Sequence, residues 1–154
     1  MKVIIVSGSV ASGKTTLAKL ISKRHHAIYV NVNSLIKEFK LYSSYNKKFK
    51  AYNVDTNKLN KFLINLIKNS KNSLVLDSHL THYLPSKYVD ICYITKCSIK
   101  ELKKRLLKRK YSKEKIRENL DAEILDVCLM EALENKHRVK VIDTTKGVKL
   151  QRSQ

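Results

Sequence analysis

One stretch near the N-terminus constrains the fold more than any other part of the chain. Residues 8–15 read GSVASGKT and match the pattern G-x-x-x-x-G-K-[ST], in which a glycine-bounded turn wraps backbone N–H groups around a phosphate. A β-branched apolar stretch precedes it at residues 3–7, and residues 16–21 follow with apolar side chains at helical spacing. A chance match in a Ser/Gly turn would lack these flanks. Strand, loop and helix in this order place the positive end of a helix dipole on the phosphate, so we expect a nucleoside triphosphate site.

Two candidate oxygen ligands for a metal ion can be named, one inside this motif and one further along the chain. Lys14 is expected to reach the β- and γ-phosphates of ATP, and the Thr15 hydroxyl to ligate Mg²⁺. Asp77 ends an apolar run at residues 73–77, where the ligand crevice of an open α/β sheet lies. Its carboxylate would orient the Mg²⁺ shell through water, opposite Thr15. The alternative is an aspartate that merely ends a strand in a turn.

The remaining chain alternates between strand and helix patterns. Apolar runs predict four further strands, at residues 27–30, 73–77, 91–94 and 139–142. Helical spacing and caps predict helices between them, at residues 32–39, 55–67 and 98–109, and one long helix at 113–134. No repeat, low-complexity block or linker interrupts this order. We therefore expect one α/β domain spanning residues 1–154, with a five-stranded parallel sheet covered by helices on both faces.

Residues 41–53 are polar and show no clear period, which predicts a loop or a mobile segment. Three tyrosines, Tyr42, Tyr45 and Tyr52, lie there among the lysines Lys47, Lys48 and Lys50. Aromatic rings among basic side chains can stack a nucleotide base and meet its phosphates. Tyrosines scattered on the surface explain the pattern equally well.

The chain carries a strong positive charge. Its 32 Lys and Arg residues face 13 Asp and Glu residues, a formal net charge of +19. Between Lys96 and Arg117, basic residues outnumber acidic ones by 11 to 2. Such a field favours polyanionic partners and makes association depend on salt, although a solvated basic face fits as well. RNA or a ribonucleoprotein is therefore a candidate partner.

Cysteine usage and hydropathy indicate where such a chain works. Three cysteines without C-x-x-C spacing are interpreted as small buried apolar residues rather than redox or zinc ligands. No run approaches the ~20 apolar residues of a membrane span, and nothing resembles a signal peptide. We expect no membrane partner and a cytoplasmic location, with the nucleus also open in a eukaryote.

Further candidate site residues lie after the third and fourth strands. His79, two residues beyond Asp77, could orient a water molecule, the acceptor or the γ-phosphate, or be an ordinary loop histidine. Asp77, His79 and His82 form an incomplete set for a transition metal. Arg105 and Arg109 share a helix face. Arg109 is predicted to close over the γ-phosphate, whereas a solvated helix arginine is the favoured interpretation of Arg105.

Several of these pieces together match a known family. They are residues 8–16, the pair Asn31-Val32, Asp55, the Asp77-x-His79 pair and the long run RLLKRKYSKEKIRENLDAEI at residues 105–124. On these residues the chain resembles the small atypical adenylate kinases of archaea and the eukaryotic nucleus, the adenylate kinase isoenzyme six family. The resemblance extends from the phosphate-binding loop to about Glu131 and is weak at residues 132–154.

The resemblance implies a P-loop nucleoside monophosphate kinase fold with two specialised segments. These are a monophosphate-binding segment at residues 31–54 and a short lid at 108–118. It implies that residues 11–16, comprising Ala11, Ser12, Gly13, Lys14, Thr15 and Thr16, bind ATP together with Arg109. It also implies that Asp77 and His79 serve phosphoryl transfer, and Asn31 would contact AMP beside Lys37. The family usually carries glycine at the positions of Ala11 and Lys110.

The predicted function is an ATP-dependent nucleoside monophosphate kinase with AMP as the favoured acceptor. The resemblance also implies slow ATP hydrolysis and a role in small-ribosomal-subunit assembly. The partner that it implies is a platform ribosomal protein, and rRNA is a second candidate partner. Two alternatives stay open: an assembly ATPase whose kinase activity is incidental, and a P-loop kinase of another small metabolite. A non-catalytic RNA-binding module fits least, because Lys14, Thr15 and Asp77 are all retained.

Overall fold

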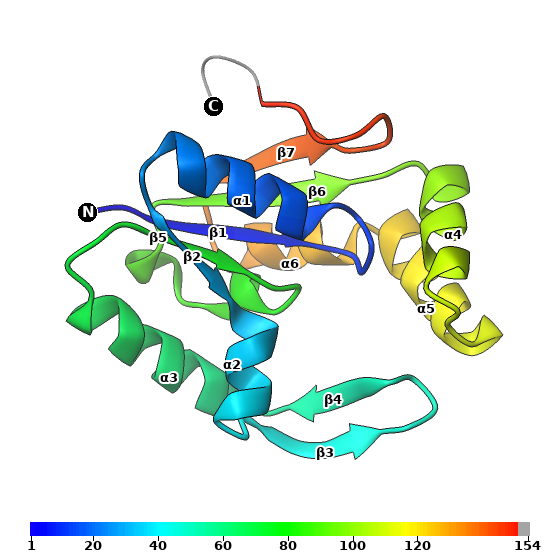
Figure 1. The fold of residues 1–154 in the computed structure, drawn as a ribbon, viewed down its shortest axis with the longest axis horizontal. Coiled ribbons are helices and arrows are strands. Elements are labelled where there is room, and N and C mark those ends of the chain that lie inside the picture. The colour runs from blue at the N-terminus through cyan, green and yellow to red at the C-terminus, as the bar shows by residue number, and fades with distance from the viewer. Residues whose placement is uncertain (151–154) are drawn as a thin grey trace.

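A five-stranded parallel sheet forms the centre of the molecule, as predicted (Figure 1). The computed structural model describes residues 1–150. The strands lie in the order β2-β5-β1-β6-β7, with the bounds β1 Val3–Gly8, β2 Ile28–Asn31, β5 Leu74–Asp77, β6 Ile91–Lys96 and β7 Val139–Asp143. β1 pairs with β5 on one side and β6 on the other. The carboxyl ends of these three strands therefore open a crevice where the chain order reverses.

Helices cover both faces of the sheet because β1 buries side chains on both. Val3 and Ile5 join one apolar cluster with α2 (Val32–Glu38), α3 (Thr56–Asn69) and α6 (Val127–Glu134). Ile4 and Val6 join the other with α1 (Lys14–Arg24), which lies in front of the sheet in Figure 1. A strand buried on both faces reads as a continuous apolar run, which is why β1 was predictable.

A separate pair of helices, α4 (Ile99–Lys108) and α5 (Lys113–Ile124), lies beside the sheet (Figure 1). Each begins at a serine whose hydroxyl accepts a backbone N–H, Ser98 for α4 and Ser112 for α5. The pair has its own small apolar cluster of Ala11, Cys97, Leu102, Leu106 and Ile116. Because Ala11 belongs to the phosphate-binding loop, α4 and α5 are packed directly onto that loop.

The segment predicted to be a loop or mobile is a β-hairpin instead. β3 (Tyr42–Asn46) pairs antiparallel with β4 (Ala51–Val54). The Tyr52 ring lies 4.4 Å from the Tyr42 ring and 4.9 Å from the Tyr45 ring, centroid to centroid. Cross-strand aromatic contacts stabilise such a pair. The hairpin covers no extended apolar face, so its sequence lacks the alternation that marks a half-buried strand.

The predicted long helix at residues 113–134 is also wrong, because it breaks into α5 and α6. Asp126 adopts a left-handed backbone conformation, with φ at 52°. Its carboxylate and that of Glu123 both pair with the Lys96 ammonium at the end of β6. Aspartate tolerates this conformation better than most residues. The break needs no glycine or proline, so the sequence gives no warning of it.

Two connecting 3₁₀ turns, Thr81–Tyr83 and Ser86–Tyr88, lead from β5 to β6. Cys92 and Cys97 are buried as predicted, and Cys128 is partly buried; all three thiols are free. None of the helices within residues 1–150 combines the length and apolar composition that crossing a bilayer requires.

The two positions at which the resemblance implies glycine hold strained backbone here. Ala11 has φ at 66° and Lys110 has φ at 57°. A left-handed conformation costs a non-glycine residue about 1–2 kcal/mol. We expect Lys110→Gly to raise the free energy of unfolding by about 1 kcal/mol, since glycine relieves this strain but adds entropy to the unfolded chain. Chemical denaturation measures the change.

Lys104→Gly is the matched control for this substitution. Lys104 is an exposed residue within α4. Glycine there should lower the free energy of unfolding by about 1 kcal/mol. If Lys110→Gly destabilises the protein as much as Lys104→Gly does, the assignment of strain to Lys110 is wrong.

Candidate active site

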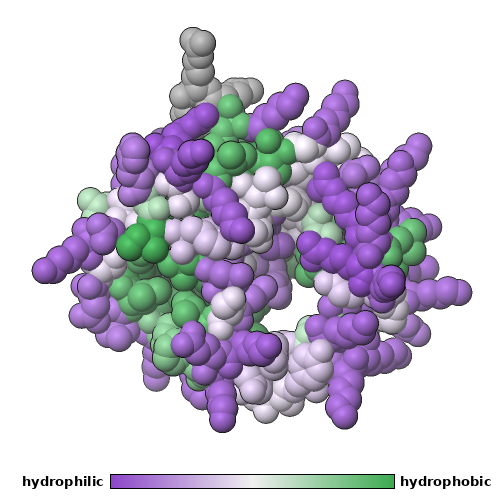
Figure 2. Space-filling view, in the orientation of Figure 1, coloured by the Kyte–Doolittle hydropathy of each residue, from purple (hydrophilic) through white to green (hydrophobic). Residues whose placement is uncertain are grey.

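A cavity of about 540 Å³ opens at the carboxyl ends of the central strands. Its walls come from the phosphate-binding loop, α2, the hairpin, the segment after β5 and the region joining α4 to α5. Figure 2 shows the molecule hollowed out above the hairpin, with hydrophilic side chains around the hollow. Every residue predicted to bind ATP, AMP or the metal lines this cavity, except Ser12. The fold thus brings together residues that are up to about 100 positions apart in the sequence.

The phosphate-binding loop is held in shape from within. The Lys14 ammonium donates a hydrogen bond to the Ser9 carbonyl oxygen at 2.7 Å. Ser12 is fully buried, and its hydroxyl contacts Thr95 Oγ1 at 2.6 Å. Its side chain therefore supports the loop rather than facing the cavity. Gly8 is required at φ 145°, because a Cβ there would lie 2.1 Å from Thr95 Oγ1.

Asp77 lies opposite the start of α1, where the parallel register of β5 with β1 places it beside Val6. One oxygen, Oδ2, accepts hydrogen bonds from Thr15 Oγ1 at 2.7 Å and from the Tyr29 hydroxyl at 2.7 Å. Burial and then the bond to Asp77 raise the pKa of Tyr29 to about 12, so this phenol stays a donor. Sequence reasoning missed Tyr29, because a tyrosine inside a strand carries no motif.

The Thr15 and Asp77 pair fits a magnesium ion. A hydroxyl and a carboxylate are oxygen ligands of the kind that Mg²⁺ takes, together with water and substrate phosphates. Asp77 is 4% exposed. It has no lysine or arginine partner within ion-pair distance among residues 1–150. A buried carboxylate bound only by neutral hydroxyls is well suited to a cation.

His79 lines the same cavity beyond Asp77. Burial, with a smaller contribution from the nearby Lys14 charge, lowers the pKa of His79 to about 3. The imidazole is therefore neutral at physiological pH and can donate or accept one hydrogen bond there. His82 serves elsewhere: its ring contacts Ser7 Oγ at 2.7 Å and Glu131 Oε2 at 2.9 Å. The set Asp77, His79 and His82 does not converge on one point.

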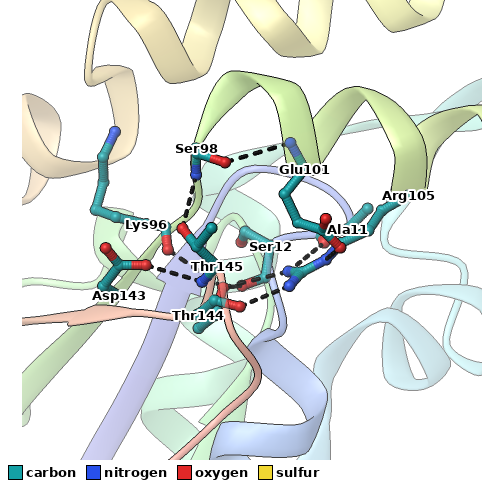
Figure 3. A network of polar contacts seen from close by, with 9 residues as sticks. All are labelled: Ala11, Ser12, Lys96, Ser98, Glu101, Arg105, Asp143, Thr144 and Thr145. Carbon is teal, nitrogen blue, oxygen red and sulfur yellow. Dashed lines mark hydrogen bonds and ion pairs between the residues drawn. The ribbon is translucent and has the colours of Figure 1, made fainter.

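Arg109 lies at the end of α4 and lines the cavity; its closure over a γ-phosphate stays a prediction. Arg105 is neither solvated nor directed at the cavity. Its guanidinium donates to the Thr144 carbonyl oxygen at 2.5 Å and to the Ala11 carbonyl oxygen at 3.4 Å, and it pairs with Glu101 (Figure 3). Both interpretations of Arg105 were wrong. It ties α4 to the phosphate-binding loop and to the end of β7.

Thr144 completes this tie from the segment after β7 (Figure 3). Its hydroxyl donates to the Ser12 carbonyl oxygen at 2.6 Å, and its backbone N–H donates to the Lys96 carbonyl oxygen at 2.8 Å. Thr145 Oγ1 accepts the backbone N–H of Ser98 at 2.9 Å. The phosphate-binding loop is thereby anchored to two segments more than 80 residues away.

The opposite wall of the cavity belongs to residues 31–54. Asn31 caps α2 by accepting the backbone N–H of Ser34 at 3.2 Å. Lys37 lines the cavity from α2, and Lys50 and Tyr52 line it from the hairpin. Among the tyrosines and lysines that the sequence suggested for base and phosphate contacts, Tyr52 and Lys50 line the cavity, whereas Tyr42, Tyr45, Lys47 and Lys48 do not.

The cavity is strongly electropositive. Its lining includes five basic side chains, Lys14, Lys37, Lys50, Lys115 and Arg109, against the single carboxylate of Asp77. Burial lowers the pKa of Lys14 to about 8, and the Asp77 charge offsets part of this shift. Such an excess of charge in a hollow favours a ligand with several negative charges.

The lowered pKa of Lys14 makes nucleotide binding depend on pH. A lowered pKa means that the proton leaves as the pH rises through about 8. The triphosphate is already fully ionised there. We expect the affinity for ATP to be constant from pH 7 to 7.5 and to fall above pH 8, by up to about tenfold per pH unit. Calorimetric titration with ATP measures it, and constant affinity up to pH 9.5 would contradict the assignment.

The contacts of Arg105 predict a structural cost for its removal. Hydrogen bonds to a charged group contribute about 1.5–3 kcal/mol. Arg105→Ala should lower the free energy of unfolding by about 2 kcal/mol and weaken ATP binding through the loosened loop. Lys103→Ala, an exposed change on α4, is the control and should alter neither quantity. Equal behaviour of the two variants in denaturation and titration would refute the anchoring role.

Comparison with known proteins agrees with this geometry. The model of a family described as "AAA domain" matches residues 4–126. A "Putative adenylate kinase" of Methanocaldococcus jannaschii is 36% identical, over 92% of this chain and 76% of its own length. The "Adenylate kinase isoenzyme 6 homolog" of Schizosaccharomyces pombe is 33% identical, over 86% of this chain and 74% of its own length.

Solved structures of P-loop kinases share the fold. A gluconokinase from Sinorhizobium meliloti superimposes with a TM-score of 0.55 at 14% identity, covering 92% of this chain and 82% of its own. A shikimate kinase from Bacteroides thetaiotaomicron gives 0.56 at 14% identity, covering 92% and 86%. The relatives match nearly the whole chain. This protein therefore belongs to the P-loop kinase family that includes the archaeal proteins named "Putative adenylate kinase" and the adenylate kinase isoenzyme 6 homologues.

Proposed function

We propose that this protein transfers the γ-phosphoryl group of ATP to a nucleoside monophosphate, with AMP as the favoured acceptor and two ADP as products. The observation that carries the proposal is the single cavity that joins the phosphate-binding loop to the basic wall of residues 31–54. A hydrolase needs room for one nucleotide and water. A cavity of about 540 Å³ with basic side chains at both ends suits two phosphate-bearing ligands.

The proposed transfer is an in-line displacement. An oxygen of the AMP α-phosphate attacks the γ-phosphorus of ATP, and the bond from that phosphorus to the β–γ bridging oxygen breaks. The bridging oxygen keeps the electron pair, so ADP leaves. Lys14 and the loop N–H groups hold the β- and γ-phosphates against this charge. Thr15 and Asp77 would hold Mg²⁺, which when bound neutralises the phosphate oxygens.

Two further residues position the reacting groups. Arg109 comes from the α4 end and would contact the transferring phosphoryl, where a guanidinium matches the developing charge. The neutral His79 ring would hydrogen-bond the attacking oxygen and orient it. The protein contributes position and charge rather than covalent chemistry.

A second candidate function is an ATPase that acts on the small ribosomal subunit, with kinase activity incidental. The net charge of +19 and the 11 to 2 excess of basic residues from Lys96 to Arg117 favour it. Those residues include α4 and the start of α5, which adjoin the cavity. A platform ribosomal protein or rRNA bound there would contact the same element that carries Arg109, and ATP hydrolysis could follow such docking.

Removing Lys14 should abolish AMP-dependent ADP formation. Lys14→Ala deletes the ammonium that faces the β- and γ-phosphates, and loss of one such charge lowers kcat by roughly 10²–10³-fold. A coupled assay of ADP with ATP and AMP measures it. Lys23→Ala, an exposed change on α1, should retain wild-type turnover. Wild-type turnover in the Lys14→Ala variant would show that the reaction does not use this loop.

The two candidate functions differ in what stimulates ATP consumption. We expect AMP to accelerate ATP consumption by the wild-type protein more than any ribosomal component does. The assay compares ATP alone, ATP with AMP, and ATP with rRNA or the platform protein, each at low and high salt. Stimulation by the ribosomal components alone would favour the assembly ATPase instead.

A further inference from the structure

Lys115 is a buried lysine without a carboxylate partner. It lies on α5, is 7% exposed and lines the cavity. None of the carboxylates within residues 1–150 forms an ion pair with its ammonium. Instead, the ammonium lies 3.9 Å from the centre of the Tyr111 ring. Two residues earlier, Lys113 is exposed in the ordinary way.

Burial of this lysine is unfavourable in the free protein. A lysine on a helix surface usually extends its ammonium into water, and an unpaired buried charge carries a large desolvation cost. The Tyr111 ring offsets part of it, since the face of an aromatic ring attracts a cation. Burial lowers the pKa of Lys115, and the charges of Arg109 and Lys50 lower it further. An anion bound in the cavity would supply the opposite charge that the buried Lys115 ammonium lacks.

Lys50 faces the same space from the hairpin. It lines the cavity, and its charge is close enough to act on Lys115. Nearby, Lys48 and Glu114 form an ion pair of 3.9 Å that links the hairpin turn to the first turn of α5. The hairpin and α5 therefore approach each other at the edge of the cavity. Two cations held on either side of an empty space can both bind one phosphate.

The donor nucleotide does not account for these two lysines. Its triphosphate has Lys14, the loop N–H groups and Arg109, and a metal site at Thr15 and Asp77. Lys37, Lys50 and Lys115 are then left without an anion. They come from α2, the hairpin and α5, and all three line the cavity.

We propose that Lys115 and Lys50, together with Lys37, bind the phosphate of the acceptor as a dianion. This inference rests on the proposed kinase function and names its acceptor subsite. Lysines act as point charges without the fixed fork of arginine. The subsite therefore selects the charge of a monophosphate more than its orientation.

The first test compares Lys115→Met with Lys113→Met, two substitutions of one type on the same helix. Lys115→Met should raise the KM for AMP by roughly 10–100-fold, as expected for loss of a charge-assisted contact, and leave the Kd for ATP within about twofold. Lys113→Met should change neither. Lys115→Arg restores the charge and should recover most of the affinity. An unchanged KM for AMP, or an equal loss of ATP affinity, would overturn the assignment.

A second pair of variants avoids the buried position. Lys50 and Lys47 are both exposed, but only Lys50 lines the cavity. Lys50→Glu should raise the KM for AMP by roughly tenfold, whereas Lys47→Glu should leave it within about twofold. Equal effects of the two changes would show that the subsite does not include Lys50, even if Lys115→Met fails to fold.

A measurement of AMP binding distinguishes a failure of this subsite from a failure of the proposed kinase function. The protein is saturated with a non-hydrolysable ATP analogue and titrated with AMP in a calorimeter. Binding by the wild-type protein and its loss in Lys115→Met support the subsite. Equal binding by both overturns the subsite and leaves the kinase function intact. If the wild-type protein neither binds nor phosphorylates AMP, the proposed function fails and the subsite fails with it.

Discussion

The parallel pairing of β1 with β5 is the constraint on which the rest of the site depends. Its register places Asp77 beside the phosphate-binding loop, where one carboxylate oxygen accepts hydrogen bonds from Thr15 and Tyr29. These two donors belong to α1 and β2, so three elements meet at one buried oxygen. A shift of the register by one residue would turn Asp77 to the other face of the sheet. Thr15 and Asp77, the proposed Mg²⁺ ligands, would then no longer face each other.

The cavity around Asp77 contains more basic side chains than carboxylates. Most cations of the cavity lack carboxylate partners, whereas lysines that serve structure have them, as Lys96 does with Glu123 and Asp126. The two arginines at the end of α4 differ in the same way. Arg105 forms an ion pair with Glu101 and binds the loop, whereas Arg109, one turn later, lines the cavity. In the cavity, therefore, the unpaired positive charges lie where we propose that phosphates bind.

The sequence predicted the central sheet and the site residues that directly follow its strands. The phosphate-binding loop, the five strands and the position of Asp77 follow from local patterns, because buried parallel strands and glycine-rich loops leave little freedom. The hairpin escaped prediction because its residues are exposed or only partly buried, so its sequence carries no apolar run. The helix break at Asp126 depends on Lys96, which is 30 residues away. The burial of Lys115 likewise depends on tertiary packing, so its spacing in the sequence gave no signal.

A structure of the protein bound to Mg²⁺ and diadenosine pentaphosphate tests the central claim most directly, because this molecule joins donor and acceptor nucleotides in one chain. The account predicts that its phosphates run from the loop at Lys14, past His79, to the lysines of α2 and α5, with the metal between Thr15 and Asp77. A phosphate chain bound outside the cavity, or an Asp77 carboxylate that faces away from the metal, would contradict it.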